Sequence, residues 1–179
     1  MKCGGKCVTL KPETHKYVRM RFLGNIEAKV DEKGRVFLPS AFRKVLDTAA
    51  EDGLVLRKDV FQPCLVLYPE SIWNKQMDDL RGRLNRWRSD HQRIFRQFVS
   101  DVEAISLDGN GRFLIPKRYI DMAGINGKVK FIGMGDSIEI WNEANTAAPF
   151  MEPDEFGKAL EQIMSGKTET NGSGDIFNF

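Results

Sequence analysis

The sequence predicts an α+β fold made of two similar halves in one chain, with helices connecting them. The first observation is a motif that occurs at residues 31–39 and again at 108–116: Asp, two further residues, Gly, Arg, three apolar residues and Pro. The second is that short β-prone runs surround each copy, and an apolar face of helical period follows each proline. The third is a helical segment between the copies. Two copies indicate a duplicated domain, since a repeat array needs at least three units.

Each motif predicts a tight turn between two strands. A largely apolar or alternating run precedes the Asp of each copy, and a β-prone run follows the Arg. An Asp that opens a turn can accept backbone N–H groups from residues further along it, and Gly tolerates a positive φ. We therefore expect each copy to be a β-hairpin. Four residues are expected to shape the two turns: Asp31, Gly34, Asp108 and Gly111.

A short amphipathic helix is expected after each hairpin. Pro39 and Pro116 end the β-prone runs because proline has no N–H for a ladder, and proline suits the first turn of a helix. Two more β-prone runs then follow in each half, at 53–56 and 64–68 in the first and at 128–133 and 137–141 in the second. Each half is thus expected to hold about four strands and one helix. The halves span residues 20–69 and 100–145.

The connector between the halves, residues 70–99, carries an apolar seam of period 3.5. The seam residues are Trp73, Met77, Leu80, Leu84, Trp87, His91, Ile94 and Phe98. Gly82 is a weak helix former, and Ser89 with Gln92 has the form of a capping box. We therefore predict two helices, at about 70–87 and 90–99, packed on the strands or on a neighbouring chain.

Six arginines lie on the polar side of the connector: Arg81, Arg83, Arg86, Arg88, Arg93 and Arg96. One interpretation is a surface that contacts phosphates. The other is a solvated face paired with nearby aspartates, or a contact between subunits. The second is favoured, because charge runs on helices are usually solvated or paired.

The two ends of the chain differ in charge and pattern. Residues 1–19 are basic and have no clear periodicity, so they are expected to be disordered or to precede a biological start at Met20; the alternative is a basic arm that contacts DNA. Residues 146–165 are expected to form a C-terminal helix with an apolar face at positions 156, 160 and 163. The polar residues of 166–179 predict a disordered tail.

Composition excludes several classes of function. The formal net charge is only +2, so bulk charge alone does not indicate a nucleic-acid binder. No apolar run has the length of a membrane span, and no membrane partner is expected.

Three cysteines, an odd number without a secretory segment, fit a reducing, cytoplasmic compartment. Neither a metal site nor a cofactor or small-molecule substrate is expected. The chain lacks a second metal-ligand pair, a Gly-x-Ser-x-Gly sequence and a P-loop, so enzymatic activity is not predicted.

Between about Met20 and Trp141 the chain resembles the MraZ family. The resemblance rests on the doubled motif and on the sequence Met-Arg-Phe-Leu-Gly-Asn that begins at Met20. It implies a SpoVT/AbrB-like fold, in which two halves related by a pseudo-twofold interlock as a swapped-hairpin β-barrel. It further implies a nucleoid-associated bacterial transcriptional regulator, typically a repressor of its own division and cell-wall gene cluster. Such proteins form homo-oligomeric rings and bind direct repeats in double-stranded DNA.

The resemblance carries the motif arginine onto Arg35 and, by duplication, onto Arg112. A guanidinium can bond a guanine edge or clamp a phosphate. Asn110 stands where Lys33 stands in the first motif, which lowers the local charge of the second. The full set of expected DNA-binding residues is Lys33, Arg35, Arg43, Lys44, Asn110, Arg112, Lys117 and Arg118.

Two alternatives stay open. The Asp–Arg pairs of the two motifs would stabilise the turns and specify the fold if the arginines did not reach DNA. The chain would instead be a ring-forming interaction module that binds protein or RNA if its binding were insensitive to DNA sequence or stronger for RNA.

Overall fold

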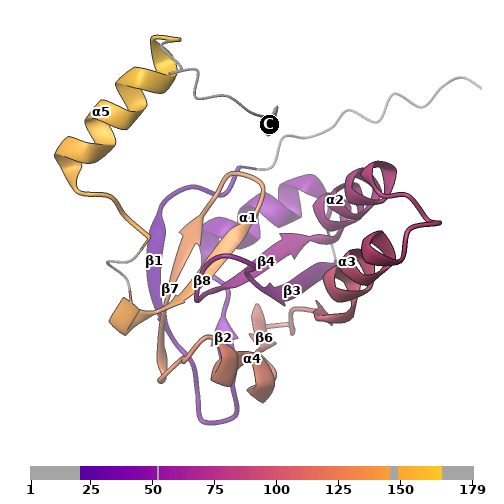
Figure 1. Ribbon diagram of the computed structural model, residues 1–179. Helices are drawn as coiled ribbons and strands as arrows, with labels where there is room; N and C mark the ends of the chain where they lie inside the picture. The colour runs from indigo at the N-terminus through magenta and orange to yellow at the C-terminus, as the bar shows by residue number, and fades with distance from the viewer. Residues whose placement is uncertain (1–20, 52, 146–148, 167–179) are drawn as a thin grey trace, which may run out of the picture. The chain divides into compact units, whose positions relative to one another are not determined.

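The computed structural model describes residues 21–51, 53–145 and 149–166 (Figure 1). The predictions for residues 1–19 and for the tail beyond 166 lie outside these ranges. The chain divides into two compact units, Met1–Glu143 and Ala144–Phe179, which are described separately.

The first unit confirms the α+β class, with four strands and one helix from each half. The first half contributes β1 (Asn25–Lys29), β2 (Arg35–Phe37), α1 (Ser40–Ala49), β3 (Leu54–Lys58) and β4 (Leu65–Pro69). The connector contributes α2 (Glu70–Arg83) and α3 (Ser89–Ser100). The second half contributes β5 (Val102–Ile105), β6 (Arg112–Leu114), α4 (Lys117–Met122), β7 (Lys128–Gly133) and β8 (Ile138–Asn142), and the 3₁₀ turn Glu143–Asn145 follows.

The strands form two antiparallel sheets, and each sheet takes strands from both halves. One has six strands in the order β1-β7-β8-β4-β3-β5, and the other is the two-stranded ribbon β2-β6. If each strand is exchanged for its counterpart in the other half (β1 for β5, β3 for β7, β4 for β8), the result is the same six-stranded order read from the opposite edge of the sheet. The ladders between halves therefore join the two copies into one structure.

The prediction that each copy pairs its own two strands as a hairpin is wrong in one respect. The turn forms, but β1 and β2 share only the bridge between Val30 and Val36. β1 pairs with β7, and β2 pairs with β6. Pairing across the halves places Val36 opposite Phe113, and both side chains are buried in the same core. The gain in buried apolar area favours this pairing over a local hairpin of three-residue strands.

The larger of the two hydrophobic clusters among the described residues contains side chains from both halves. Phe22 and Phe42 meet edge to face at 5.8 Å, and Phe113 of the ribbon meets Phe131 of β7 at 6.4 Å. Tyr119 of α4 is fully buried in the same cluster. The first aromatic pair comes from one half and the second joins the ribbon to the six-stranded sheet, so the ribbon is fixed by aromatic packing.

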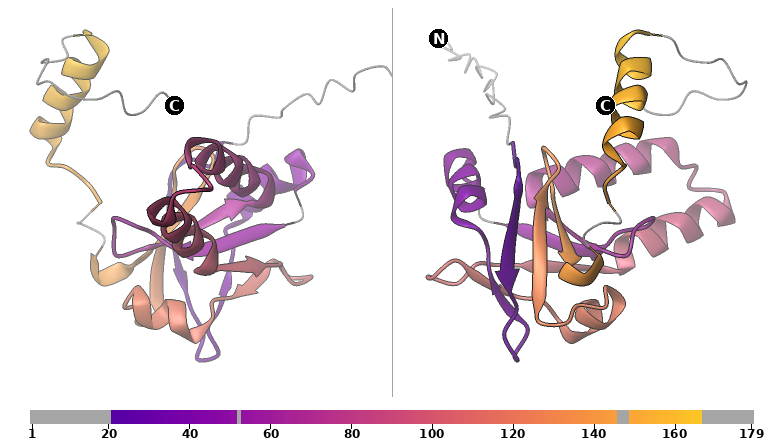
Figure 2. Two further views of the ribbon diagram at one scale, coloured as in Figure 1. Left: turned by 45° about the vertical axis from the view of Figure 1, so that its right-hand side comes forward. Right: turned by 90° about the vertical axis from the view of Figure 1, so that its left-hand side faces the viewer.

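The connector forms two helices as predicted, and they lie side by side as an antiparallel pair (Figure 2). Trp73 of α2 stacks on Phe98 of α3 with ring centroids 4.9 Å apart. The guanidinium of Arg57, on β3, lies 4.5 Å from the Phe98 ring centroid and 5.5 Å from that of Trp73. A buried arginine among aromatic rings thus attaches the helical pair to the sheet.

The break between the helices differs from the prediction. Helix α2 ends at Arg83, four residues before the expected end, and Trp87 is 95% exposed instead of packing in the seam. No side-chain cap closes the start of α3, so the capping box is absent. Instead, the Gln92 side chain donates to the Arg86 carbonyl at 2.6 Å, and the Asn85 N–H donates to His91 Nδ1 at 2.9 Å. These bonds stabilise a linking turn and take Trp87 out of the helix.

The second unit contains α5 (Pro153–Met164), which lies within the predicted range 146–165 but begins only at Pro153. Proline at its first turn suits helix initiation. Within the described residues, no helix has the length and apolar content needed to cross a membrane.

Candidate nucleic-acid interface

The first motif folds into a turn closed by its own aspartate. Asp31 Oδ1 accepts the N–H groups of Lys33 at 2.9 Å and Arg35 at 2.8 Å, and Oδ2 accepts Arg35 Nε at 2.7 Å. The backbone adds a bond from the Gly34 N–H to the Asp31 carbonyl. The carboxylate therefore organises the turn and fixes the direction of the arginine side chain.

The second motif repeats this arrangement bond for bond. Asp108 Oδ1 accepts the N–H groups of Asn110 and Arg112, both at 2.9 Å, and Oδ2 accepts Arg112 Nε at 2.8 Å. The Gly111 N–H bonds the Asp108 carbonyl at 2.8 Å. The two motifs are thus alike in their hydrogen bonds as well as in their sequence.

The two turn glycines have positive φ and face crowded surroundings. Gly34 has φ +82° and Gly111 has φ +78°, in the left-handed region that favours glycine. A Cβ on Gly34 would lie 2.7 Å from the Ile115 carbonyl oxygen, and one on Gly111 would meet the Arg43 guanidinium. The Gly34 carbonyl accepts the Ile115 N–H at 2.8 Å. Each glycine therefore lets the other half of the chain approach closely.

The ribbon β2-β6 brings both motif arginines to one surface. In its register Arg35 lies opposite Leu114, Phe37 lies opposite Arg112, and the central residue of each strand is buried. Because side chains alternate between the faces of a strand, the other four residues share the outer face. Phe37 and Leu114 are 55% and 52% exposed. The Arg112 guanidinium lies 5.5 Å from the Phe37 ring centroid. We call these four residues the ribbon face.

The ribbon face includes two residues that the sequence interpretation missed. Phe37 and Leu114 lie in the three apolar positions of each motif, and a β-prone run alone predicts no surface role for them. Because side chains alternate between the two faces of a strand, the central one of the three apolar residues in each motif points away from the other two, and this alternation could have identified it. The partner strand decides which face is outer, and that depends on long-range pairing.

Each half places its helix start beside the other half's turn. Arg43 Nη1, on α1, approaches the Asn110 carbonyl at 3.4 Å, and Arg43 lies over Gly111. Arg43 and Lys44 line one cavity with the second turn, including Asp108. The predicted residues are therefore grouped across the halves, with Arg43 and Lys44 next to the second motif.

The second group surrounds the first turn, which projects beyond the ends of the strands in Figure 2. Lys33 and Lys117 line a single cavity with Gly34. Arg118 is directed elsewhere: its Nη2 donates to Glu103 Oε2 at 2.8 Å and to the Tyr119 hydroxyl at 2.9 Å. Lys33 and Lys117 are exposed, and Arg118 is occupied by an ion pair.

In the described residues, neither the cysteine thiol nor the metal-ligating types of side chain form a reactive site. Burial raises the pKa of the Cys64 thiol to about 12, so the thiol stays protonated and is a poor nucleophile. Within 21–51, 53–145 and 149–166, no three His, Cys, Asp or Glu side chains are grouped to hold a metal ion.

The turn aspartates make the fold sensitive to acid. The backbone N–H of Arg35 holds the pKa of Asp31 below its ordinary value, with a further contribution from the Arg35 side chain; Arg112 acts in the same way on the pKa of Asp108. A folded-state pKa below the unfolded value gives stability that is present above the unfolded pKa and lost as pH falls through the folded pKa. The loss is therefore expected below about pH 4.

We expect Asp31→Asn combined with Asp108→Asn to lower the Tm at pH 7 by several degrees, because two turns lose their charged acceptors. The Tm difference from wild type should shrink at pH 3, because the stability that the lowered pKa of each carboxylate contributes begins to be lost below the unfolded pKa. Thermal unfolding by circular dichroism at the two pH values measures both effects, with Asp78→Asn on α2 as the control. A double variant as stable as wild type at pH 7 would show that the aspartates do not stabilise the turns.

This chain is similar to a family of known proteins and to individual members of it. Residues 21–94 and 98–148 match the family model for MraZ protein. A protein named transcriptional regulator MraZ from Phocaeicola vulgatus is 64% identical over 145 residues, which are 81% of this chain and 94% of the relative. One of the same name from Bacteroides fragilis is 58% identical over 86% of this chain and 98% of its own length. Another, from Christiangramia forsetii, is 36% identical over 81% and 94%.

Proposed function

The chain belongs to the MraZ family of transcriptional regulators, and from this premise we propose that it binds specific DNA sequences through the ribbon face. The observation that carries the proposal is that two copies of one motif meet in a single ribbon with both arginines on its outer face. The major groove of B-DNA admits a two-stranded β-ribbon, and arginine bonded bidentately to guanine is its commonest specific contact.

The spacing within the ribbon face suits neighbouring base pairs. Arg35 and Arg112 are diagonal neighbours in the register, an arrangement that separates such residues by roughly 7–8 Å. Base pairs stack at about 3.4 Å, so the two guanidinium groups would reach positions about two steps apart. Phe37 and Leu114 between them offer apolar contact to thymine methyl groups.

The aspartates orient the arginines without using all their donors. A guanidinium has five N–H groups, and Asp108 engages Nε of Arg112. Asp31 engages Nε and lies 2.7 Å from Nη2 of Arg35, which leaves Nη1. A donor held in advance loses less conformational entropy on binding. In this proposal one ion pair serves both the turn and the reading of DNA.

The basic residues beside the turns supply phosphate contacts. Lys33 and Lys117 lie at the first turn, and Lys44 lies with Arg43 at the second. A formal net charge of +2 gives a single chain little non-specific affinity, because that affinity follows from the number of phosphates neutralised. Arg118, paired with Glu103, is the least available of the predicted residues.

The proposal extends to fold type and assembly. The pairing of strands across the halves supports a SpoVT/AbrB-like swapped-hairpin barrel with a pseudo-twofold, completed within one chain. By the family resemblance, several chains form a ring on direct repeats and repress the division and cell-wall gene cluster in the cytoplasm, at the nucleoid. Linked sites raise affinity through effective concentration.

The test is binding to DNA from upstream of the protein's own gene, with one repeat or with all repeats intact. We expect the full set to bind about 10²- to 10⁴-fold more tightly than one repeat, because linked binding events gain that much. Fluorescence anisotropy at two salt concentrations measures the affinities, and higher salt should weaken both. Equal affinity for one repeat and for the full set would contradict assembly-dependent binding, and tighter binding to RNA of the same sequence would favour an interaction module.

A further inference from the structure

Helix α5 has an apolar side that no described residue of its own unit covers. Phe156, Leu160, Ile163 and Met164 are between 46% and 78% exposed and recur at helical spacing. The opposite side carries Asp154, Lys158, Glu161 and Gln162, and the helix as a whole has three acidic residues and one basic residue. A helix of 12 residues is marginally stable alone in water, so its apolar side requires a partner surface.

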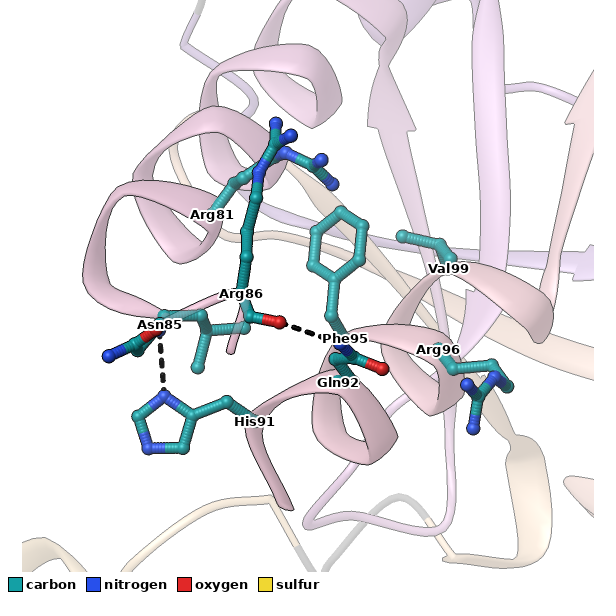
Figure 3. A pocket seen from close by; sticks show the side chains of 9 residues that line it. Arg81, Asn85, Arg86, His91, Gln92, Phe95, Arg96 and Val99 are labelled. Atoms are coloured by element: carbon teal, nitrogen blue, oxygen red, sulfur yellow. Dashed lines mark hydrogen bonds between the residues drawn. The ribbon is translucent and has the colours of Figure 1, made fainter. Parts of the chain in front are cut away.

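The α2–α3 pair offers a cavity of the complementary kind. Its volume is about 420 Å³, and Leu84, Phe95 and Val99 form its apolar lining. Three arginines surround this lining, Arg81, Arg86 and Arg96, and no acidic side chain belongs to it. Figure 3 shows the Phe95 ring between the two helices, with the side chains of Arg81 and Arg86 beside it.

The arginines of this cavity are available for an acidic partner. The Arg81 guanidinium lies 4.8 Å from the Phe95 ring centroid. Among the ion pairs between described residues, none involves Arg81, Arg86 or Arg96, whereas the neighbouring Arg88 is paired with Asp90. The cavity therefore combines an apolar floor with uncompensated positive charge, as the acidic amphipathic α5 requires.

We propose that α5 of one chain docks its apolar side into the α2–α3 cavity of a second copy of this chain. This inference rests on the assembly in the proposed function and names the surface that builds it. An amphipathic helix in a hydrophobic groove is a recurrent mode of recognition, anchored at positions i, i+4 and i+7. Phe156, Leu160 and Ile163 have this spacing. The net acidic charge of α5 is complementary to the cavity arginines, which favours the correct partner.

Docking of this kind joins two different surfaces, a helix on one copy and a cavity on the next. Such a heterologous contact leaves each added copy with one unused helix or cavity. It therefore generates a closed ring when the rotation between copies closes, and an open filament when it does not. The same contact repeated around a ring presents the ribbon faces at regular intervals.

The first test places a lysine on the apolar side of α5 in the full chain. Leu160→Lys opposes the cavity arginines and removes an anchor, whereas the control Gln162→Lys adds the same charge on the opposite side. We expect native mass spectrometry to give multi-subunit masses for wild type and for Gln162→Lys, and the 20.4 kDa single chain for Leu160→Lys. Circular dichroism checks that the fold is intact. A Leu160→Lys chain that assembles like wild type would overturn the proposal.

The second test separates docking between copies from docking within one chain. The double variant Arg86→Glu/Arg96→Glu alters exposed cavity residues, and Arg83→Glu/Arg93→Glu is its matched control outside the cavity. We expect the first to be a single chain and the control to assemble. Mixing the first with Leu160→Lys should then restore masses that contain both chains. Absence of mixed species, with both variants folded, would overturn docking between copies.

The experiments distinguish a failure of the docking proposal from a failure of the proposed DNA binding. If docking is correct, Leu160→Lys keeps the affinity for a single repeat, because its ribbon face is intact, and loses the gain from several repeats. If the ribbon face does not read DNA, wild type assembles but binds no repeat specifically. A wild-type protein of 20.4 kDa in solution would overturn the docking and the ring together.

Discussion

Phe113→Ala is expected to destabilise the protein by about 3–5 kcal/mol, the range for removing a buried aromatic side chain. Phe113 is the central residue of β6, is 2% exposed, lies opposite Val36 and meets Phe131 of the six-stranded sheet. Its loss leaves a cavity where the ribbon joins the sheet. A total stability of about 5–15 kcal/mol would be reduced substantially.

Urea unfolding measures this effect, with Leu114→Ala as a control one residue along the same strand. Leu114 is 52% exposed on the ribbon face, and surface changes of this kind stay within about 0.5 kcal/mol. We expect a large fall in the midpoint for Phe113→Ala and little change for Leu114→Ala. Equal midpoints for the two variants would show that the ribbon is not held to the sheet by this packing.

The second large effect concerns DNA. Replacing both ribbon arginines, Arg35→Gln with Arg112→Gln, is expected to weaken binding to the specific DNA about 10²- to 10⁴-fold, because each bidentate contact to a base contributes about 1–3 kcal/mol. The fold should survive, since the Asp–Arg pairs are partly exposed and such pairs contribute little to stability. The backbone N–H bonds to Asp31 and Asp108 remain in the variant.

A matched control separates the role of the arginines in the turns from contact with DNA. Asp31→Asn with Asp108→Asn weakens the same pairs but keeps both arginines. If the arginines act at DNA, this variant keeps most of the specific affinity, because both guanidinium groups remain and the loss of two negative charges offsets the loss of their orientation by the aspartates. If both double variants lose affinity alike, the pairs act through the shape of the turn.

Local structure was largely predictable from the sequence. The apolar or alternating runs and the β-prone runs around each motif indicated the strands, and the helical spacing after each proline indicated the helices. The Asp-x-x-Gly-Arg pattern indicated turns with Asp31 and Asp108 as acceptors. These features depend on neighbours within a few residues, where hydrogen bonding and backbone preference dominate.

The remaining features depend on contacts between distant residues. Nothing local shows that β2 pairs with β6, and the outer position of Phe37 and Leu114 follows from that pairing. Arg43 reaches the second turn 67 residues away. The early end of α2 depends on bonds from Gln92 and His91 to the link, which compete with continuing the helix to Trp87.

The measurement that tests the ribbon face most directly compares specific and scrambled DNA for three proteins: wild type, Arg35→Gln/Arg112→Gln and Arg93→Ala. Arg93 is exposed on α3, outside the ribbon and the α2–α3 cavity. We predict that wild type and Arg93→Ala prefer the specific DNA equally, and that the ribbon variant, still folded and assembled, binds both DNAs with the same low affinity. A ribbon variant that keeps its preference, or an Arg93→Ala variant that loses it, would contradict reading by the ribbon face.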